Sequence, residues 1–109
     1  MRAVSIITRR QGDTAIVAID GAIDISNVGQ MDDQVTAAVE SADTTNVLVD
    51  LSGLTFMDSS GISSLLKGRR RADALGTQYQ VAGAEGLVRQ VLNLTGVWTY
   101  LSRPLSERD

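Results

Sequence analysis

The stretch LTFMDSSGISSLL, residues 54–66, changes character in its middle. An acid and two hydroxyls are followed by a glycine, and then by apolar residues at helical spacing. The preceding NVLVDLS, residues 46–52, holds a short β-branched core that is too brief for a helix and predicts a buried strand. The chain thus passes from strand to polar loop to helix. In a parallel α/β sheet, sites are usually built at the carboxyl ends of strands.

Strand and helix patterns flank this stretch. Val4–Thr8 and Thr14–Asp20 are rich in Val and Ile, and RRQGD between them predicts a hairpin with a tight turn. TQYQVAG (77–83) predicts a further strand, and VWTYLS (97–102) predicts a short final strand or extended segment. Three apolar stripes predict helices whose buried residues are Val28, Met31, Val35, Ala38 and Val39; Ile62, Leu65, Leu66, Ala72 and Leu75; and Ala84, Leu87, Val88, Val91 and Leu92.

A hairpin followed by strand–helix units predicts an α/β fold, a small mixed β-sheet of four or five strands flanked by helices. With 109 residues, 43% hydrophobic and 21% charged, the chain is expected to form one domain over residues 1–109, ending in a polar tail at 103–109. Ser26 or Asn27 is expected to cap the first helix, and Gly76 to end the second.

Several classes of site and location are excluded by composition. The chain has no cysteine and no histidine, which removes disulfides, thiolate metal sites and the usual general base. No stretch approaches the roughly 20 apolar residues of a membrane span, and the first residues lack the features of a signal peptide. The sequence therefore predicts a cytoplasmic protein without a membrane span.

The formal net charge of −3 is unevenly distributed. Nine acids and three bases precede Ser59, whereas four acids and seven bases follow from there on, so no nucleic-acid partner is expected. The basic run KGRRR (67–71) lies in a helical pattern without aromatics and is interpreted as a solvated helix face. Lys67, Arg70 and Arg71 remain able to meet an acidic partner.

The polar loop admits two interpretations. Asp58 or Ser59 is a good N-cap, because its side-chain oxygen can accept a free backbone N–H of the helix. Capping needs one such residue, however, and a glycine in the first turn lowers helix stability relative to alanine. Gly61 therefore predicts that something approaches the backbone closely. From the residues alone, a helix cap and a functional site both stay open.

The sequence lacks the residues and motifs that common classes of enzyme require. Without histidine no Ser-His-Asp triad exists, and neither G-x-S-x-G nor a glycine-rich phosphate-binding motif is present. An aspartyl-phosphate receiver needs further acids at a strand end, but Asp32 and Asp33 fall in a helical pattern, and the only lysine is Lys67. A serine that accepts phosphate from another protein remains, with nucleotide hydrolysis by the acidic loop as a competing hypothesis.

Three segments resemble the STAS-domain family, and within it the single-domain anti-sigma-factor antagonists of bacteria. GAID (21–24) is similar to the family's G-x-[LI]-D, and LVDLSGLTFMDSSGISSLL (48–66) follows its strand, loop and helix with D-[ST]-[ST]-G. YQVAGAEGLVRQVLNLTGV (79–97) looks like its closing strand and helix. The resemblance spans nearly the whole chain and implies a STAS-like fold.

For the site, the resemblance implies that Ser60 is the phosphoacceptor, because it is the hydroxyl directly before the motif's glycine. Asp24, Asp58, Ser59 and Gly61 would then belong to the surface that docks the partner. From the turn preferences of Asp alone, Asp24 is instead expected to turn or cap the AIDIS segment.

The implied partner is an anti-sigma factor with a serine-kinase fold, which would phosphorylate the chain with Mg-ATP. Unphosphorylated chain would bind it and release a sigma factor, in a partner-switching circuit of the kind used in stress responses. Phosphorylated chain would let go until a metal-dependent serine phosphatase resets it. The protein would be a substrate without catalytic residues, metal or cofactor, and the resemblance also allows a homodimer.

Two departures from the family and one alternative complete the hypothesis. Family members commonly continue past the last strand into a further helix, whereas RPLSERD (103–109) stops almost at once, and the missing helix is expected to weaken a dimer or expose an edge. The heavier run RRR (69–71) is expected to tune partner choice by charge. The alternative is a STAS scaffold or accessory subunit of a stressosome-like or transporter assembly, which would not depend on a kinase.

Overall fold

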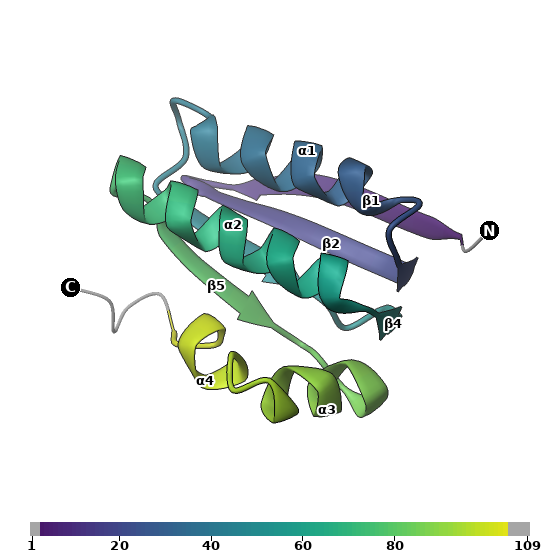
Figure 1. Cartoon of the computed structure of the whole chain (residues 1–109). Helices are drawn as coiled ribbons and strands as arrows, with labels where there is room; N and C mark the ends of the chain where they lie inside the picture. The colour runs from purple at the N-terminus through teal and green to yellow at the C-terminus, as the bar shows by residue number, and fades with distance from the viewer. Residues whose placement is uncertain (1–2, 105–109) are drawn as a thin grey trace.

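The computed structural model describes residues 3–104, which form one mixed sheet with helices packed against it (Figure 1). The strands are β1 Val4–Gln11, β2 Thr14–Ile23, β3 Asn46–Asp50, β4 Leu54–Met57 and β5 Gln78–Ala82. The helices are α1 Val28–Glu40, α2 Ser59–Leu75, α3 Gly86–Leu94 and α4 Trp98–Leu101. The predicted α/β class with a small mixed sheet is confirmed. Residues 105–109 of the expected polar tail lie outside the described residues.

The predicted hairpin is confirmed as β1 and β2. These strands pair antiparallel, with Gln11 opposite Thr14, so that the turn consists of Gly12 and Asp13. Gly12 has a φ of 62°, a left-handed conformation that glycine adopts without a steric penalty. The glycine at this position is therefore what permits the two-residue turn.

Strand β2 is the centre of the sheet. Besides β1 it pairs in parallel with two strands in turn: Thr14–Ala18 lie beside β3, and Gly21–Ile23 lie beside β4. Strand β5 pairs with the far edge of β3. The sequence predicted that β2 would end at Asp20 and that 54–57 would be loop, and both expectations were wrong. A run of four residues, 54–57, is too short to show the alternation that indicates a strand. It forms a strand because it pairs with β2.

Helices α1 and α2 lie side by side over one face of the sheet (Figure 1). Their predicted inward residues are largely confirmed: Met31, Val35, Ala38, Val39, Ile62, Leu65 and Ala72 are buried. Leu75 was predicted to be inward, but it is 47% exposed, since it is the last residue before Gly76 turns the chain with a φ of 73°. Within residues 3–104, no helix is long and apolar enough to cross a bilayer.

Helix α2 approaches its neighbours closely at Gly68. A Cβ atom at this position would lie 2.7 Å from the Tyr79 hydroxyl and 2.8 Å from Val35 Cγ1. These distances are shorter than van der Waals contact, so that only a residue without a side chain fits. Gly68 therefore sets the separation between α2, α1 and the sheet.

Helix α3 packs on β4 with a narrower apolar stripe than the sequence indicated. Val88 and Leu92 are completely buried, whereas Leu87, which was predicted to be inward, is 52% exposed. Since α3 contacts the body of the protein along one side only, a residue one position before the buried stripe turns toward solvent.

The prediction of a final strand or extended segment is wrong, because residues 98–101 form the short helix α4. Aromatic and β-branched residues favour strands, but their preference depends on packing. Here Gly96, with a φ of 76°, turns the chain back, so that Leu101 is completely buried and Trp98 stacks under the guanidinium of Arg89 at 4.3 Å. The expectation of a missing further helix concerned RPLSERD (103–109), of which 105–109 lie outside the described residues.

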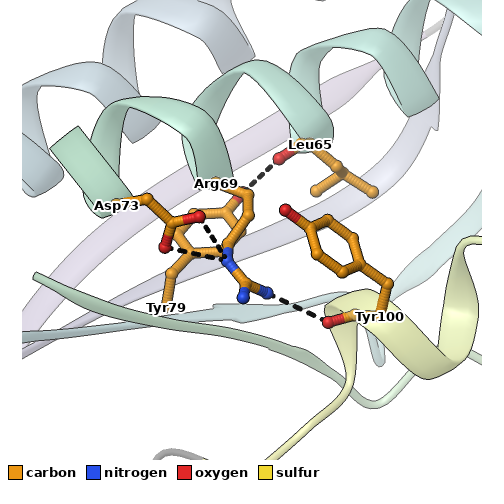
Figure 2. Close-up of polar contacts among 5 residues, drawn as sticks. All are labelled: Leu65, Arg69, Asp73, Tyr79 and Tyr100. Atoms are coloured by element: carbon orange, nitrogen blue, oxygen red, sulfur yellow. Dashed lines mark hydrogen bonds and ion pairs between the residues drawn. The ribbon is translucent and has the colours of Figure 1, made fainter. Parts of the chain in front are cut away.

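A polar cluster joins α4 to α2 (Figure 2). Arg69 Nη1 donates to the Tyr100 carbonyl at 3.0 Å, its Nε donates to the Asp73 carboxylate at 3.1 Å, and its guanidinium lies 4.3 Å from the centre of the Tyr100 ring. Beside it, Tyr79 Oη donates to the Leu65 carbonyl at 2.9 Å. Burial raises the pKa of Tyr79 well above its ordinary value, with a smaller opposing effect of Arg69, so its hydroxyl stays protonated and donates.

The basic run was therefore only partly a solvated face. Arg69 is 7% exposed and structural, which corrects the expectation that all of RRR tunes partner choice. Lys67, Arg70 and Arg71 line a groove between α1 and α2. Lys67 Nζ lies 3.7 Å from an Asp32 oxygen, and Arg71 Nε lies 2.8 Å from a Glu40 oxygen. Lys67 and Arg71 are thus already paired with acidic side chains of the same chain.

Gly68→Ala is expected to lower the free energy of unfolding by about 1–3 kcal/mol, because the new methyl group overpacks against Tyr79 and Val35. The matched control is Gly29→Ala in α1, where a Cβ meets nothing within 4 Å. It should be neutral or stabilising by up to about 1 kcal/mol. Urea unfolding of both variants measures the difference, and equal effects would contradict the close approach at Gly68.

Arg69→Ala is expected to lower the free energy of unfolding by about 2–3 kcal/mol, because it removes the charged hydrogen bonds to the Tyr100 carbonyl and to Asp73. Arg70→Ala removes the neighbouring, exposed arginine and should change the free energy of unfolding by less than about 0.5 kcal/mol. Urea unfolding checks both values. Similar losses for the two variants would show that the cluster does not anchor α4.

Candidate functional site

The candidate site lies where β2 and β4 end together. In the parallel pairing of these strands Ile23 is opposite Met57, so the next residues, Asp24 and Asp58, leave the sheet side by side. The Asp58 N–H donates to the Ile23 carbonyl at 3.4 Å, which continues the pairing into the loop. Two acids that are far apart in the sequence are thus brought to one edge of the sheet, as the resemblance implied.

Asp58 caps helix α2 and at the same time holds Ser60. Its backbone is extended, and its Oδ1 accepts the Ser60 N–H at 2.9 Å, the bond that defines an N-cap. The same oxygen accepts the Ser60 hydroxyl at 2.5 Å. The predicted cap is confirmed, and it does not compete with a site, because one carboxylate both caps the helix and orients the hydroxyl of Ser60.

Asp24 makes the equivalent contacts in the neighbouring loop. Its Oδ1 accepts the Ser26 N–H at 2.9 Å and the Ser26 hydroxyl at 2.5 Å. Its carbonyl accepts the Val28 N–H at 2.9 Å. Asp24 therefore turns the AIDIS segment into α1, as the turn preferences of Asp predicted, and its loop lies beside the loop that carries Asp58.

Asn27 is a positioning residue whose role the sequence did not reveal. It occupies the N-cap position of α1, one of the two predicted there, but its side chain makes no capping bond. Instead, its amide donates to the Ala22 carbonyl at 2.9 Å and accepts the Asp24 N–H at 2.9 Å. The Asn27 side chain is buried, with 6% exposure, and its two bonds hold the loop onto the end of β2.

The close approach predicted at Gly61 exists, and it comes from inside the protein. A Cβ atom there would lie 2.3 Å from Met57 Cγ and 3.2 Å from Ile23 Cγ2. Gly61 is buried, and its lack of a side chain lets the first turn of α2 rest on the ends of β2 and β4. Packing is thus sufficient to explain the glycine.

The exposed part of the site is polar with one apolar residue. Ser59 is exposed, whereas Asp24, Asp58 and Ser60 are half-buried. Ile25 is 79% exposed, which makes it a prominent apolar side chain beside these groups. Among the described residues, no group of three or more acidic side chains is placed to hold a metal ion.

The other acids considered for a receiver-type site lie elsewhere. Asp32 and Asp33 belong to α1, where the sequence placed them. An Asp32 oxygen accepts the hydroxyl of Ser64, a buried residue of α2, and the other faces Lys67. These groups join the two helices and do not reach the loop that carries Asp58.

Known structures share this fold. An anti-sigma factor antagonist from Mycobacterium paratuberculosis superposes with a TM-score of 0.82 at 20% identity, over 96% of this chain and 90% of that one. The anti-sigma factor antagonist SpoIIAA, in its unphosphorylated form, gives a TM-score of 0.76 at 22% identity, over 88% of this chain and 84% of that one.

Sequence comparison agrees with the structural likeness. The anti-sigma F factor antagonist of Lysinibacillus sphaericus is 25% identical over 96 residues, which are 88% of this chain and 82% of the relative. The family model described as "Mlab, STAS domain" matches residues 6–102. That match extends from β1 through α4 and includes both loops of the candidate site, and the chain belongs to the STAS-domain family.

Proposed function

We propose that this protein is an anti-sigma-factor antagonist that is switched by phosphorylation of Ser60. When unphosphorylated it binds an anti-sigma factor that is also a serine kinase, and thereby releases a sigma factor. The names of its relatives support the regulatory class: they include an anti-sigma F factor antagonist and other anti-sigma factor antagonists. SpoIIAA has been solved in both an unphosphorylated and a phosphorylated form.

The observation that carries the proposal is the environment of the Ser60 hydroxyl. It lies at the edge of the sheet, bonded to Asp58 at 2.5 Å, and the exposed Ser59 precedes it. The protein is then the substrate of the reaction. The Asp58 carboxylate orients the Ser60 hydroxyl oxygen, while the kinase supplies Mg-ATP and the catalytic groups.

A phosphate on Ser60 would change the surface without unfolding the protein. The residue is in the first turn of α2, where free backbone N–H groups and the helix dipole favour an anion. The modification replaces the hydroxyl proton that Asp58 accepts, so an attractive bond becomes a repulsion between a carboxylate and a phosphate of about −1.5 to −2 charges. The altered groups lie beside Asp24, at the edge we assign to docking.

The docking surface we propose consists of Asp24, Asp58 and Ser59, with the backbone at Gly61 beside them. Its two carboxylates favour a partner that presents basic groups. A further negative charge at Ser60 would oppose the same partner, which gives release on phosphorylation. A serine phosphatase would remove the phosphate and restore binding.

Ser60→Ala and Ser60→Asp should differ strongly in affinity for the anti-sigma kinase. The alanine variant should bind about as tightly as the unmodified protein, because it adds no charge. The aspartate variant should lose roughly 2–5 kcal/mol of binding free energy, because the added charge is desolvated at the interface. Isothermal titration calorimetry measures both, and equal affinities would contradict a switch at Ser60.

Incubation with a candidate anti-sigma kinase from the same genome and Mg-ATP should add phosphate at Ser60, as seen by intact-mass analysis and peptide mapping. Ser60→Ala should abolish that phosphate, and Ser59→Ala, which changes the exposed neighbouring hydroxyl, should leave it in place. Absence of phosphate with every such kinase would refute the switch and favour the STAS scaffold or accessory-subunit alternative.

A further inference from the structure

Three Asp-x-Ser triplets occur at the carboxyl ends of three parallel strands. They are Asp24-Ile25-Ser26 after β2, Asp50-Leu51-Ser52 at the end of β3, and Asp58-Ser59-Ser60 after β4. In each triplet the serine N–H donates to Oδ1 of the aspartate, at 2.9, 3.0 and 2.9 Å respectively. The three serines therefore share one local backbone arrangement.

Within the described part of the chain, the aspartate accepts a hydrogen bond from the serine hydroxyl in only two of the triplets. Ser26 Oγ and Ser60 Oγ each donate to their aspartate at 2.5 Å, whereas no such bond joins the Ser52 hydroxyl to Asp50. Ser26 and Ser60 thus share an environment that Ser52 does not.

The two matching triplets are also neighbours in space. Ile23 and Met57, which directly precede them, are paired across β2 and β4. Asp50 pairs instead with Ala18, in the middle of β2, so its triplet leaves the sheet away from the other two. A protein that docks on the Ser60 loop therefore meets Ser26 as well.

We propose that Ser26 is a second phosphoacceptor, used by the same kinase as Ser60. The inference rests on the proposed function, and it adds a modification site to the same docking edge. Ser26 is exposed while Ser60 is half-buried, so the Ser26 hydroxyl is at least as open to an incoming phosphoryl group. Its partner Asp24 matches Asp58 in the two bonds of its carboxylate, which accepts both the N–H and the hydroxyl of the serine two residues on.

The transfer is the same at both serines. The Ser26 Oγ–P bond forms as the bond between the γ-phosphorus of ATP and its bridging oxygen breaks, and ADP leaves. The Asp24 carboxylate orients the hydroxyl through its hydrogen bond, and the hydroxyl proton passes to a base of the kinase and then to solvent. No oxidant, reductant or further reactant is needed.

The fold tolerates a phosphate at this position. The Ser26 hydroxyl bonds to the Asp24 carboxylate, and the residue itself is exposed. The buried bonds that hold the loop belong to the side chain of Asn27, which bonds to Ala22 and to the backbone of Asp24. Phosphorylation at Ser26 would thus add negative charge to the docking edge while leaving these bonds in place, so that two phosphates would give a graded switch.

The test is a time course of the full chain with the anti-sigma kinase and Mg-ATP, followed by intact-mass analysis and peptide mapping of the phosphates. The unmodified protein should gain two phosphates, on Ser26 and Ser60. Ser26→Ala and Ser60→Ala should each gain one, on the remaining site. Ser52→Ala is the matched control and should still gain two.

The outcomes separate this inference from the proposed function. Phosphate on Ser60 alone in the unmodified protein would overturn the second site and leave the switch intact. Phosphate on Ser26 alone would support the second site and refute the switch at Ser60, and phosphate on neither would refute both. Phosphate on Ser52 together with Ser26 would overturn the argument that the hydroxyl bond marks the acceptor. Mapping on the unmodified protein makes the result independent of how well any variant folds.

Discussion

The parallel pairing of β2 with β4 is the constraint on which the candidate site depends. It extends β2 beyond the residues that pair with β3 and places Ile23 opposite Met57. Because the strands run in the same direction and end together, the polar residues after each strand meet at one edge. A shift of one residue in this pairing would turn the side chains to opposite faces and separate the two carboxylates.

Glycines then fix how α2 meets the sheet. Gly61 lets the first turn of the helix rest on Met57, and Gly68 lets its middle pass close to Tyr79 and Val35. Larger residues would push the helix outward at either point. Since Asp58 caps the same helix, these contacts and the cap together hold Ser60 in a defined position relative to the neighbouring loop. The Arg69 cluster secures the other part of the helix to α4.

Much of this could be predicted because it depends on neighbours in the sequence. The hairpin, the buried strand at 46–50, the first two helical stripes and the Asp58 cap all follow from local periodicity or from capping and turn chemistry. The failures were segments whose conformation depends on distant contacts. Strand β4 is too short to show a period, and 98–101 has strand-forming residues that pack as a helix against α2 and α3. Arg69 resembles its exposed neighbours in sequence, yet it is buried.

By itself, the sequence determined which residue types are available for the proposed switch. Three serines follow an aspartate by two positions, a glycine follows Ser60, and the chain has no histidine or cysteine. Only the tertiary structure decided which of these groups stand together. It brought the loops after β2 and β4 to one edge of the sheet, set the loop after β3 apart from them, and assigned Gly61 to internal packing. The physical reason is that the proximity of two strand ends is set by sheet register, which results from packing across the whole core and not from any local run of residues.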